Sequence, residues 1–95
     1  MRILIAEDER DLNELIKKRL KNNGYSVDAC FDGEEALHYL SVAEYDAVIL
    51  DVMMPKMMGF DVCRALRAEG DNVPVIILTA REEEEDKILG LEIGA

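Results

Sequence analysis

The sequence has 95 residues, of which 49% are hydrophobic and 34% are charged, which excludes a disordered or collagen-like chain and predicts a single domain over residues 1–95. Eleven basic and twenty-one acidic side chains give a net charge of −10 at pH 7, and residues 32–95 carry all of this excess. An acidic surface repels phosphate groups, and no apolar run reaches the roughly 18 residues that span a bilayer, so we expect no direct nucleic-acid binding, no membrane insertion and a cytoplasmic location.

Strand and helix patterns alternate along the chain. An apolar run at Arg2–Ala6 predicts a buried strand, and Leu12, Leu15, Ile16 and Leu20 have the spacing of one helix face. That helix is expected to end at Gly24. Further strands are predicted at residues 25–30, 47–50 and 74–79. Further helices are predicted at residues 32–40, 59–69 and 82–91, the first of them with Asp32 and Glu35 as a capping pair.

Four strand–helix units in succession predict an α/β fold, with a parallel sheet, right-handed crossovers and helices on both faces. In such a sheet, functional side chains gather at the carboxyl ends of the strands. These ends carry Glu7, Asp8 and Glu9 after the first strand, Asp51 after the third and Thr79 at the fourth.

The acidic residues at these ends suggest a cation site. If the first and third strands are neighbours, Asp8 and Asp51 converge on one point, with Glu7 close by. Clustered carboxylates either share a proton or bind a cation, and this number of oxygen ligands suits Mg²⁺. The structural alternative is that residues 7–9 only begin the first helix, with Asp8 as its N-cap.

Four short segments then carry a resemblance to a known family. They are the pair Glu7-Asp8, Asp51 within the run Leu-Asp-Val-Met-Met-Pro at residues 50–55, Gly59 at the start of a helix, and Thr79-Ala80 after a strand. Over its whole length the chain resembles the receiver domain of two-component response regulators. The resemblance implies a flavodoxin-like, doubly wound parallel sheet, here (βα)4 with strand order 2-1-3-4. The Glu-Asp-Glu run resembles the branch whose receivers precede a winged-helix DNA-binding domain.

The resemblance also implies a role for each residue. Asp51 would be the phosphoacceptor, taking a phosphoryl group from a histidine kinase, and no other enzymatic activity is expected. Asp8, Asp51 and the backbone carbonyl of Met53 would hold Mg²⁺, with Glu7 acting through water. Thr79 would be the switch hydroxyl that responds to phosphorylation.

The sequence departs from the family pattern in three places, one of which is the uniform run of four glutamates at residues 82–85. Receivers have a fifth strand, which carries a Lys that contacts the phosphoryl group, and a fifth helix, and this chain stops at Ala95 before both. We therefore expect impaired phosphotransfer and a homodimer that pairs through the exposed apolar edge of the fourth strand. Met58 stands where receivers commonly have a small polar residue. These departures leave open an alternative, an engineered receiver-derived scaffold that self-associates and does not signal.

Overall fold

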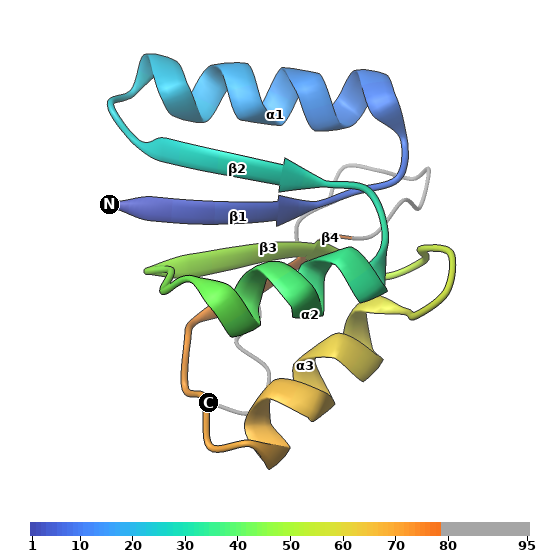
Figure 1. Ribbon diagram of the computed structural model, residues 1–95. Helices are drawn as coiled ribbons and strands as arrows, with labels where there is room; N and C mark the ends of the chain where they lie inside the picture. Colours follow the sequence, from blue (N-terminus) through green and yellow to red (C-terminus); the bar gives the residue numbers. More distant parts are fainter. Residues whose placement is uncertain (79–95) are drawn as a thin grey trace.

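The computed structural model describes residues 1–78, which form an α/β sandwich around one parallel sheet (Figure 1). The elements are β1 (Arg2–Ala6), α1 (Arg10–Asn22), β2 (Ser26–Cys30), α2 (Gly33–Val42), β3 (Ala47–Asp51), α3 (Gly59–Ala68) and β4 (Val75–Leu78). The strand order is β2-β1-β3-β4, and all three strand pairs are parallel. The predicted fold class and strand order are therefore confirmed. Thr79 and the helix expected at residues 82–91 lie outside the described residues.

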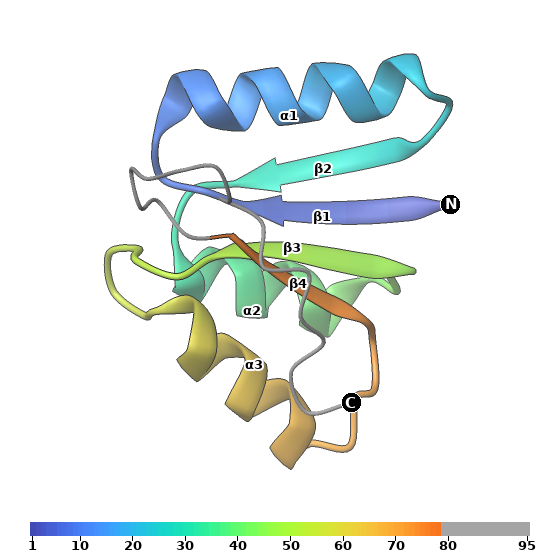
Figure 2. The same cartoon turned by 180° about the vertical axis from the view of Figure 1, so that it is seen from behind.

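The helices cover the two faces of the sheet unequally. Helix α1 lies on one face, and α2 and α3 lie together on the other (Figures 1 and 2). The larger core lies on the side of α2 and α3, where alternate strand residues meet both helices. Its fully buried members include Leu4, Val48, Leu50, Ile77 and Val62. Each such side chain contributes about 1.5–3 kcal/mol by leaving water, so this face supplies most of the apolar stabilisation.

Helix α1 buries less of its apolar stripe than its spacing predicts. Leu15 is 47% exposed and Leu12 is also exposed, whereas the one buried residue of the helix is the polar Asn13. Among residues 1–78, α1 is alone on its face of the sheet, so no second helix there covers its flank. The helix ends as expected, because Gly24 follows it with a φ of +93°, in the left-handed region that glycine adopts without strain.

Helix α2 begins with the capping pair that its sequence predicts. The Asp32 carboxylate accepts a hydrogen bond from the backbone N–H of Glu35 at 2.8 Å. The Glu35 side chain in turn accepts one from the backbone N–H of Phe31, also at 2.8 Å. Helix α3 has no such cap, because its N-cap residue is Met58, whose side chain offers no hydrogen-bond acceptor to the first turn.

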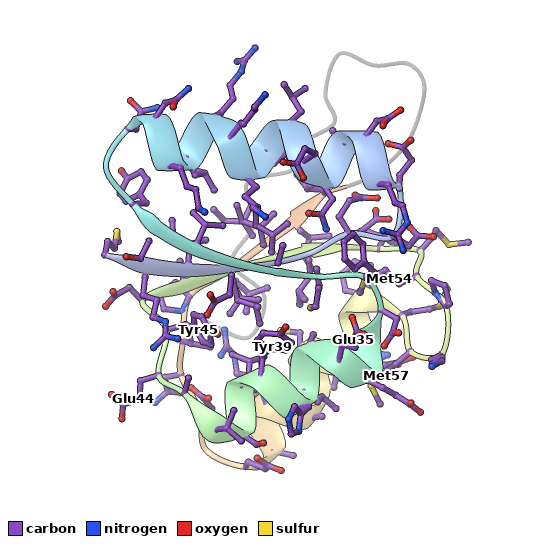
Figure 3. All side chains as sticks on the ribbon, turned by 45° about the horizontal axis from the view of Figure 1, so that its top comes forward. Glu35, Tyr39, Glu44, Tyr45, Met54 and Met57 are labelled. Carbon is purple, nitrogen blue, oxygen red and sulfur yellow. The ribbon has the colours of Figure 1, made fainter. Side chains whose placement is uncertain are left out.

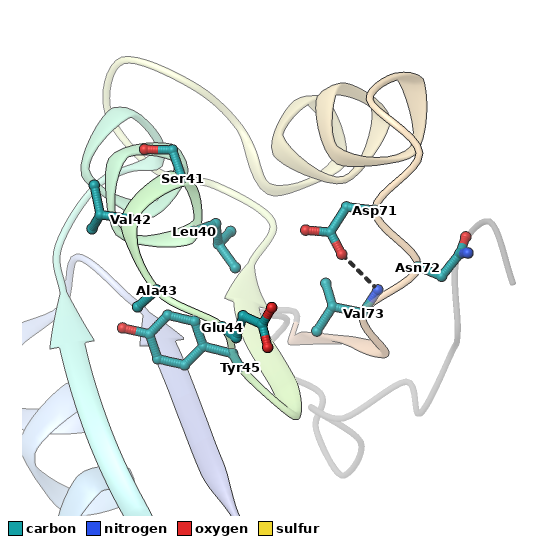
Figure 4. A pocket seen from close by; sticks show the side chains of 9 residues that line it. All are labelled: Leu40, Ser41, Val42, Ala43, Glu44, Tyr45, Asp71, Asn72 and Val73. Carbon is teal, nitrogen blue, oxygen red and sulfur yellow. Dashed lines mark hydrogen bonds between the residues drawn. The ribbon is translucent and has the colours of Figure 1, made fainter.

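The amino ends of the strands are held by a polar cluster far from the strand-end acids. The Asp28 carboxylate accepts hydrogen bonds from Tyr45 at 2.6 Å and from Arg2 at 3.0 Å. Next to Tyr45, an open groove of about 680 Å³ runs between the loop after α2 and the segment before β4, with Glu44 and Asp71 on its two sides (Figure 4). This groove therefore lies at the amino ends of the strands, whereas the acids lie at their carboxyl ends.

No helix within residues 1–78 has both the length and the apolar character needed to cross a membrane.

The missing cap of α3 leads to a stability prediction. We expect Met58→Asp to raise the free energy of unfolding by about 1 kcal/mol, because the new carboxylate accepts a hydrogen bond from the first turn of the helix. Urea denaturation without divalent cations measures this change. Met58→Ala is the matched control, since it shortens the same exposed side chain and offers no hydrogen-bond acceptor to the first turn. Equal effects of the two substitutions would contradict the prediction.

Candidate functional site

Three carboxylates meet at the carboxyl ends of the central strands. β1 and β3 are neighbours, with Ala6 paired to Leu50, so the residues that follow them lie side by side. Glu7, Asp8 and Asp51 each place one carboxylate oxygen so that all three oxygens lie within 4.8 Å of one another. The structure therefore brings together the three acids that the sequence analysis singled out. Thr79 is outside the described residues, and Met53 lies two residues beyond Asp51 in the loop that leads to α3.

Asp51 is the last residue of β3 and is only 5% exposed. Burial raises its pKa to about 6, and repulsion from the Asp8 carboxylate adds to this rise, while the backbone N–H groups of Val52 and Met53 oppose it. The carboxylate is thus held in place by its own strand and by the start of the following loop. Its ionised form is costly unless positive charge comes near.

Glu7 is still less accessible, at 2% exposure. Its carboxylate accepts a hydrogen bond from the backbone N–H of Glu9 at 2.9 Å, which fixes the side chain over the end of β1. Burial raises the pKa of Glu7 to about 7, and repulsion from Asp51 and Asp8 contributes to the rise. Near neutral pH this group is therefore poised between its protonated and ionised forms.

The ion pairs of the described residues lie elsewhere. Within residues 1–78, basic side chains pair with Asp28, Asp32 and Asp61, and none pairs with the three clustered acids. Carboxylates so close together, two of them buried, need a proton or a cation to balance their charge. Hard oxygen ligands in this number are suited to Mg²⁺.

The helix after β1 begins one residue later than the structural alternative assumed. Its N-cap is Glu9, whose carboxylate accepts a hydrogen bond from the backbone N–H of Leu12 at 2.7 Å. The assignment of Asp8 as the N-cap is therefore wrong. Because Glu9 caps the helix, the Asp8 side chain remains available to the cluster.

Close backbone contacts position the loop between β3 and α3. A Cβ added to Gly59 would lie 2.2 Å from the carbonyl oxygen of Asp51, so only glycine allows α3 to start there. A Cβ on Gly33, at the start of α2, would lie 2.3 Å from the carbonyl oxygen of Met57. Figure 3 shows Met57 beside the first turn of α2, where Glu35 lies.

Two features of this loop were not foreseen from the sequence. Lys56 has a φ of +70°, which is uncommon for a residue with a side chain and stores strain on the order of 1 kcal/mol. Its ammonium group lies 3.8 Å from the Asp32 carboxylate, across to the N-cap of α2. The only local signal is Pro55, which favours a turn but does not reveal the backbone conformation of the next residue.

Comparison with known proteins gives a consistent result. The family model for the response regulator receiver domain matches residues 3–95. A relative named response regulator MprA, from Mycobacterium avium (strain 104), is 45% identical over all 95 residues, which make up 42% of its own length. The chain thus spans about two fifths of the length of the curated relatives it matches.

Solved structures with the same fold include two that contain magnesium. The response regulator protein TrrA from Thermotoga maritima, in complex with Mg²⁺ and BeF, matches with a TM-score of 0.80 and 40% identity, over 84% of this chain and 70% of that one. The receiver domain of sensor histidine kinase PA1611 from Pseudomonas aeruginosa PAO1 has a magnesium ion coordinated in its active-site cleft. It matches with a TM-score of 0.80 and 33% identity, over 90% of this chain and 71% of that one.

The raised pKa values lead to a prediction about pH. Glu7 and Asp51 have ordinary values of 4.5 and 3.8 and values of about 7 and about 6 in the folded protein. Over this interval the folded protein keeps protons that the unfolded chain has released. The contribution of the two groups to the free energy of unfolding therefore decreases as the pH rises from about 4 to about 7.

Urea denaturation across this pH range, with a chelator present, measures the effect. Glu7→Gln removes one of the two titrations. We therefore expect the free energy of unfolding of the wild type, minus that of the variant, to decrease as the pH rises. Adding Mg²⁺ at pH 7 should stabilise the wild type more than the variant, because a ligand of the folded state shifts the folding equilibrium. A wild-type-minus-variant difference that grows with pH would refute this account.

Proposed function

The chain belongs to the response regulator receiver domain family, and we propose that it accepts a phosphoryl group on Asp51 in a two-component signalling system. The donor would be the phosphohistidine of a histidine kinase. The observation that carries the proposal is the cluster of three carboxylates within 4.8 Å, with Asp51 fixed at the end of a central strand. The same cluster favours a phosphoacceptor over the scaffold alternative, which needs no such arrangement of acids.

The donor set fits Mg²⁺. It consists of carboxylate oxygens, two of them buried, and no basic side chain within residues 1–78 pairs with them. We assign Glu7, Asp8, Asp51 and the backbone carbonyl of Met53 to this cation, with Glu7 acting through water. When bound, Mg²⁺ supplies positive charge that reduces the repulsion between the acids and an incoming phosphoryl group.

The residues of the chain then have separate tasks. An oxygen of the Asp51 carboxylate attacks phosphorus, the phosphorus–nitrogen bond of the phosphohistidine breaks, and its electron pair returns to the imidazole. The product is an acyl phosphate on Asp51 and a free histidine on the kinase. The β3 strand and the N–H of Met53 orient the attacking carboxylate. Thr79, outside the described residues, is proposed as the hydroxyl that responds to the new phosphoryl group.

Two further expectations stay predictions. Impaired phosphotransfer and a homodimer through the β4 edge are not tested by residues 1–78. Within that part, β4 lies at one edge of the sheet, next to β3. Sedimentation velocity on the purified protein distinguishes a monomer from a dimer directly.

Phosphorylation by a small donor tests the proposed function. We expect acetyl phosphate with Mg²⁺ to add the mass of one phosphoryl group to the intact protein and to release acetate. Asp51→Asn should abolish this adduct, and a chelator should prevent it in the wild type. Asp61→Asn is the matched control, because Asp61 is an exposed aspartate on α3, and it should be phosphorylated like the wild type. A folded wild type that forms no adduct would favour the scaffold alternative.

A further inference from the structure

Asn13 is a buried polar residue in an otherwise exposed stretch of α1. It is 1% exposed, and the helix contributes no other buried residue. Burying an amide without hydrogen-bond partners costs a few kcal/mol, so its contacts show what it does. Its side-chain N–H groups donate to the carbonyl oxygens of Glu7 and Cys30, each at 2.9 Å.

Both acceptors lie at strand ends that border the carboxylate cluster. Cys30 is the last residue of β2. Glu7 directly follows β1, the strand that pairs with β2. The backbone N–H of Glu7 also donates to the carbonyl of Cys30, at 3.2 Å. The main chain of Glu7 is therefore held from both sides, by β2 through its N–H and by Asn13 through its carbonyl.

The held carbonyl belongs to the peptide that joins Glu7 to Asp8, two of the three clustered acids. A peptide group is planar, so a fixed carbonyl also fixes the direction in which the chain enters Asp8. The next backbone N–H, that of Glu9, is bound by the Glu7 side chain at 2.9 Å. Asn13 is itself placed by the first turn of α1, through a bond from its own N–H to the carbonyl of Glu9 at 2.9 Å.

From this geometry we propose that Asn13 is a positioning residue for the cation site: its amide sets the Glu7–Asp8 peptide and thereby the placement of two carboxylates. The proposal rests on the function proposed above and deepens it. It also specifies the chemistry required at position 13. Both side-chain N–H groups are used, so neither an ionised aspartate nor an apolar residue can replace the asparagine.

The test compares magnesium affinity with stability. Asn13→Leu keeps the branched shape of the side chain but removes both donors, and Asn13→Gln keeps the donors. Val73→Ala is the matched control, because Val73 is buried next to the groove at the amino ends of the strands. Titration calorimetry with MgCl2 is carried out where circular dichroism shows each protein folded. If Asn13→Leu does not fold, Asn13→Ala, which removes the donors with less crowding, takes its place.

We expect Asn13→Leu to weaken magnesium binding about tenfold, as loss of a supporting contact does at other metal sites. Asn13→Gln should recover part of this loss, and Val73→Ala should bind like the wild type although it is less stable. Wild-type affinity in Asn13→Leu, or an equal loss in Val73→Ala, would overturn the proposal, because Asn13 would then only support the fold.

A second readout needs no metal. In metal-free protein, hydrogen exchange followed by NMR should be faster at the backbone amides of Glu7 and Glu9 in Asn13→Leu. The amide of Val48 in β3, which donates to the carbonyl of Pro74 before β4 at 2.9 Å, should not change. Unchanged exchange at Glu7 and Glu9 would also overturn the proposal. A wild type that shows this protection but binds no magnesium would instead refute the proposed function and leave the placement by Asn13 intact.

Discussion

Repulsion between carboxylates is the constraint around which this structure is arranged. Glu7, Asp8 and Asp51 offer oxygens within 4.8 Å of one another, and two of these residues are buried. Such an arrangement destabilises the folded state when all three are ionised. The apolar core beneath α2 and α3 lies on the other side of β1 and β3, and its burial offsets that cost. The clustered carboxylates thus lower the stability of the folded domain, and the apolar core supplies most of that stability.

Main-chain groups do most of the positioning at this edge. The backbone N–H of Glu9 donates to the Glu7 carboxylate, and the side-chain amide of Asn13 donates to the carbonyls of two strand ends. The backbone N–H groups of Val52 and Met53 favour the ionised form of Asp51. Gly59 allows the first turn of α3 to lie against the carbonyl of Asp51. Backbone contacts of this kind are short and stiff, so the carboxylates are placed before any cation or phosphoryl donor arrives. Preorganised charge of this kind is what the proposed phosphoryl transfer requires.

The sequence predicts the frame of the site better than its details. Apolar runs locate the strands, and acids directly after two of them locate the site, because parallel strands end at the same edge. The N-cap of α1 was assigned to Asp8, which is wrong, since three consecutive acids can each cap a helix and only geometry selects Glu9. Periodicity assigned Leu15 to an inner face but does not say what covers that face. Asn13 gave no sign in the sequence of bridging two strands, because its partners are carbonyl groups that any residue has.

The contact at Gly59 also bears on how the segment between β3 and α3 can vary. Its N–H donates to the carbonyl of Val52 at 2.9 Å, so residues 52–59 form a closed ring whose two ends are already joined. Extra residues inside such a ring cost little, about 0.6 kcal/mol for each doubling of its length. Such insertions would also leave Asp51 in place, because the hydrogen bond between Gly59 and Val52 lies outside the inserted part. The part of the segment between Met53 and Met57 can therefore vary in length, while the residue at the closing point must remain glycine.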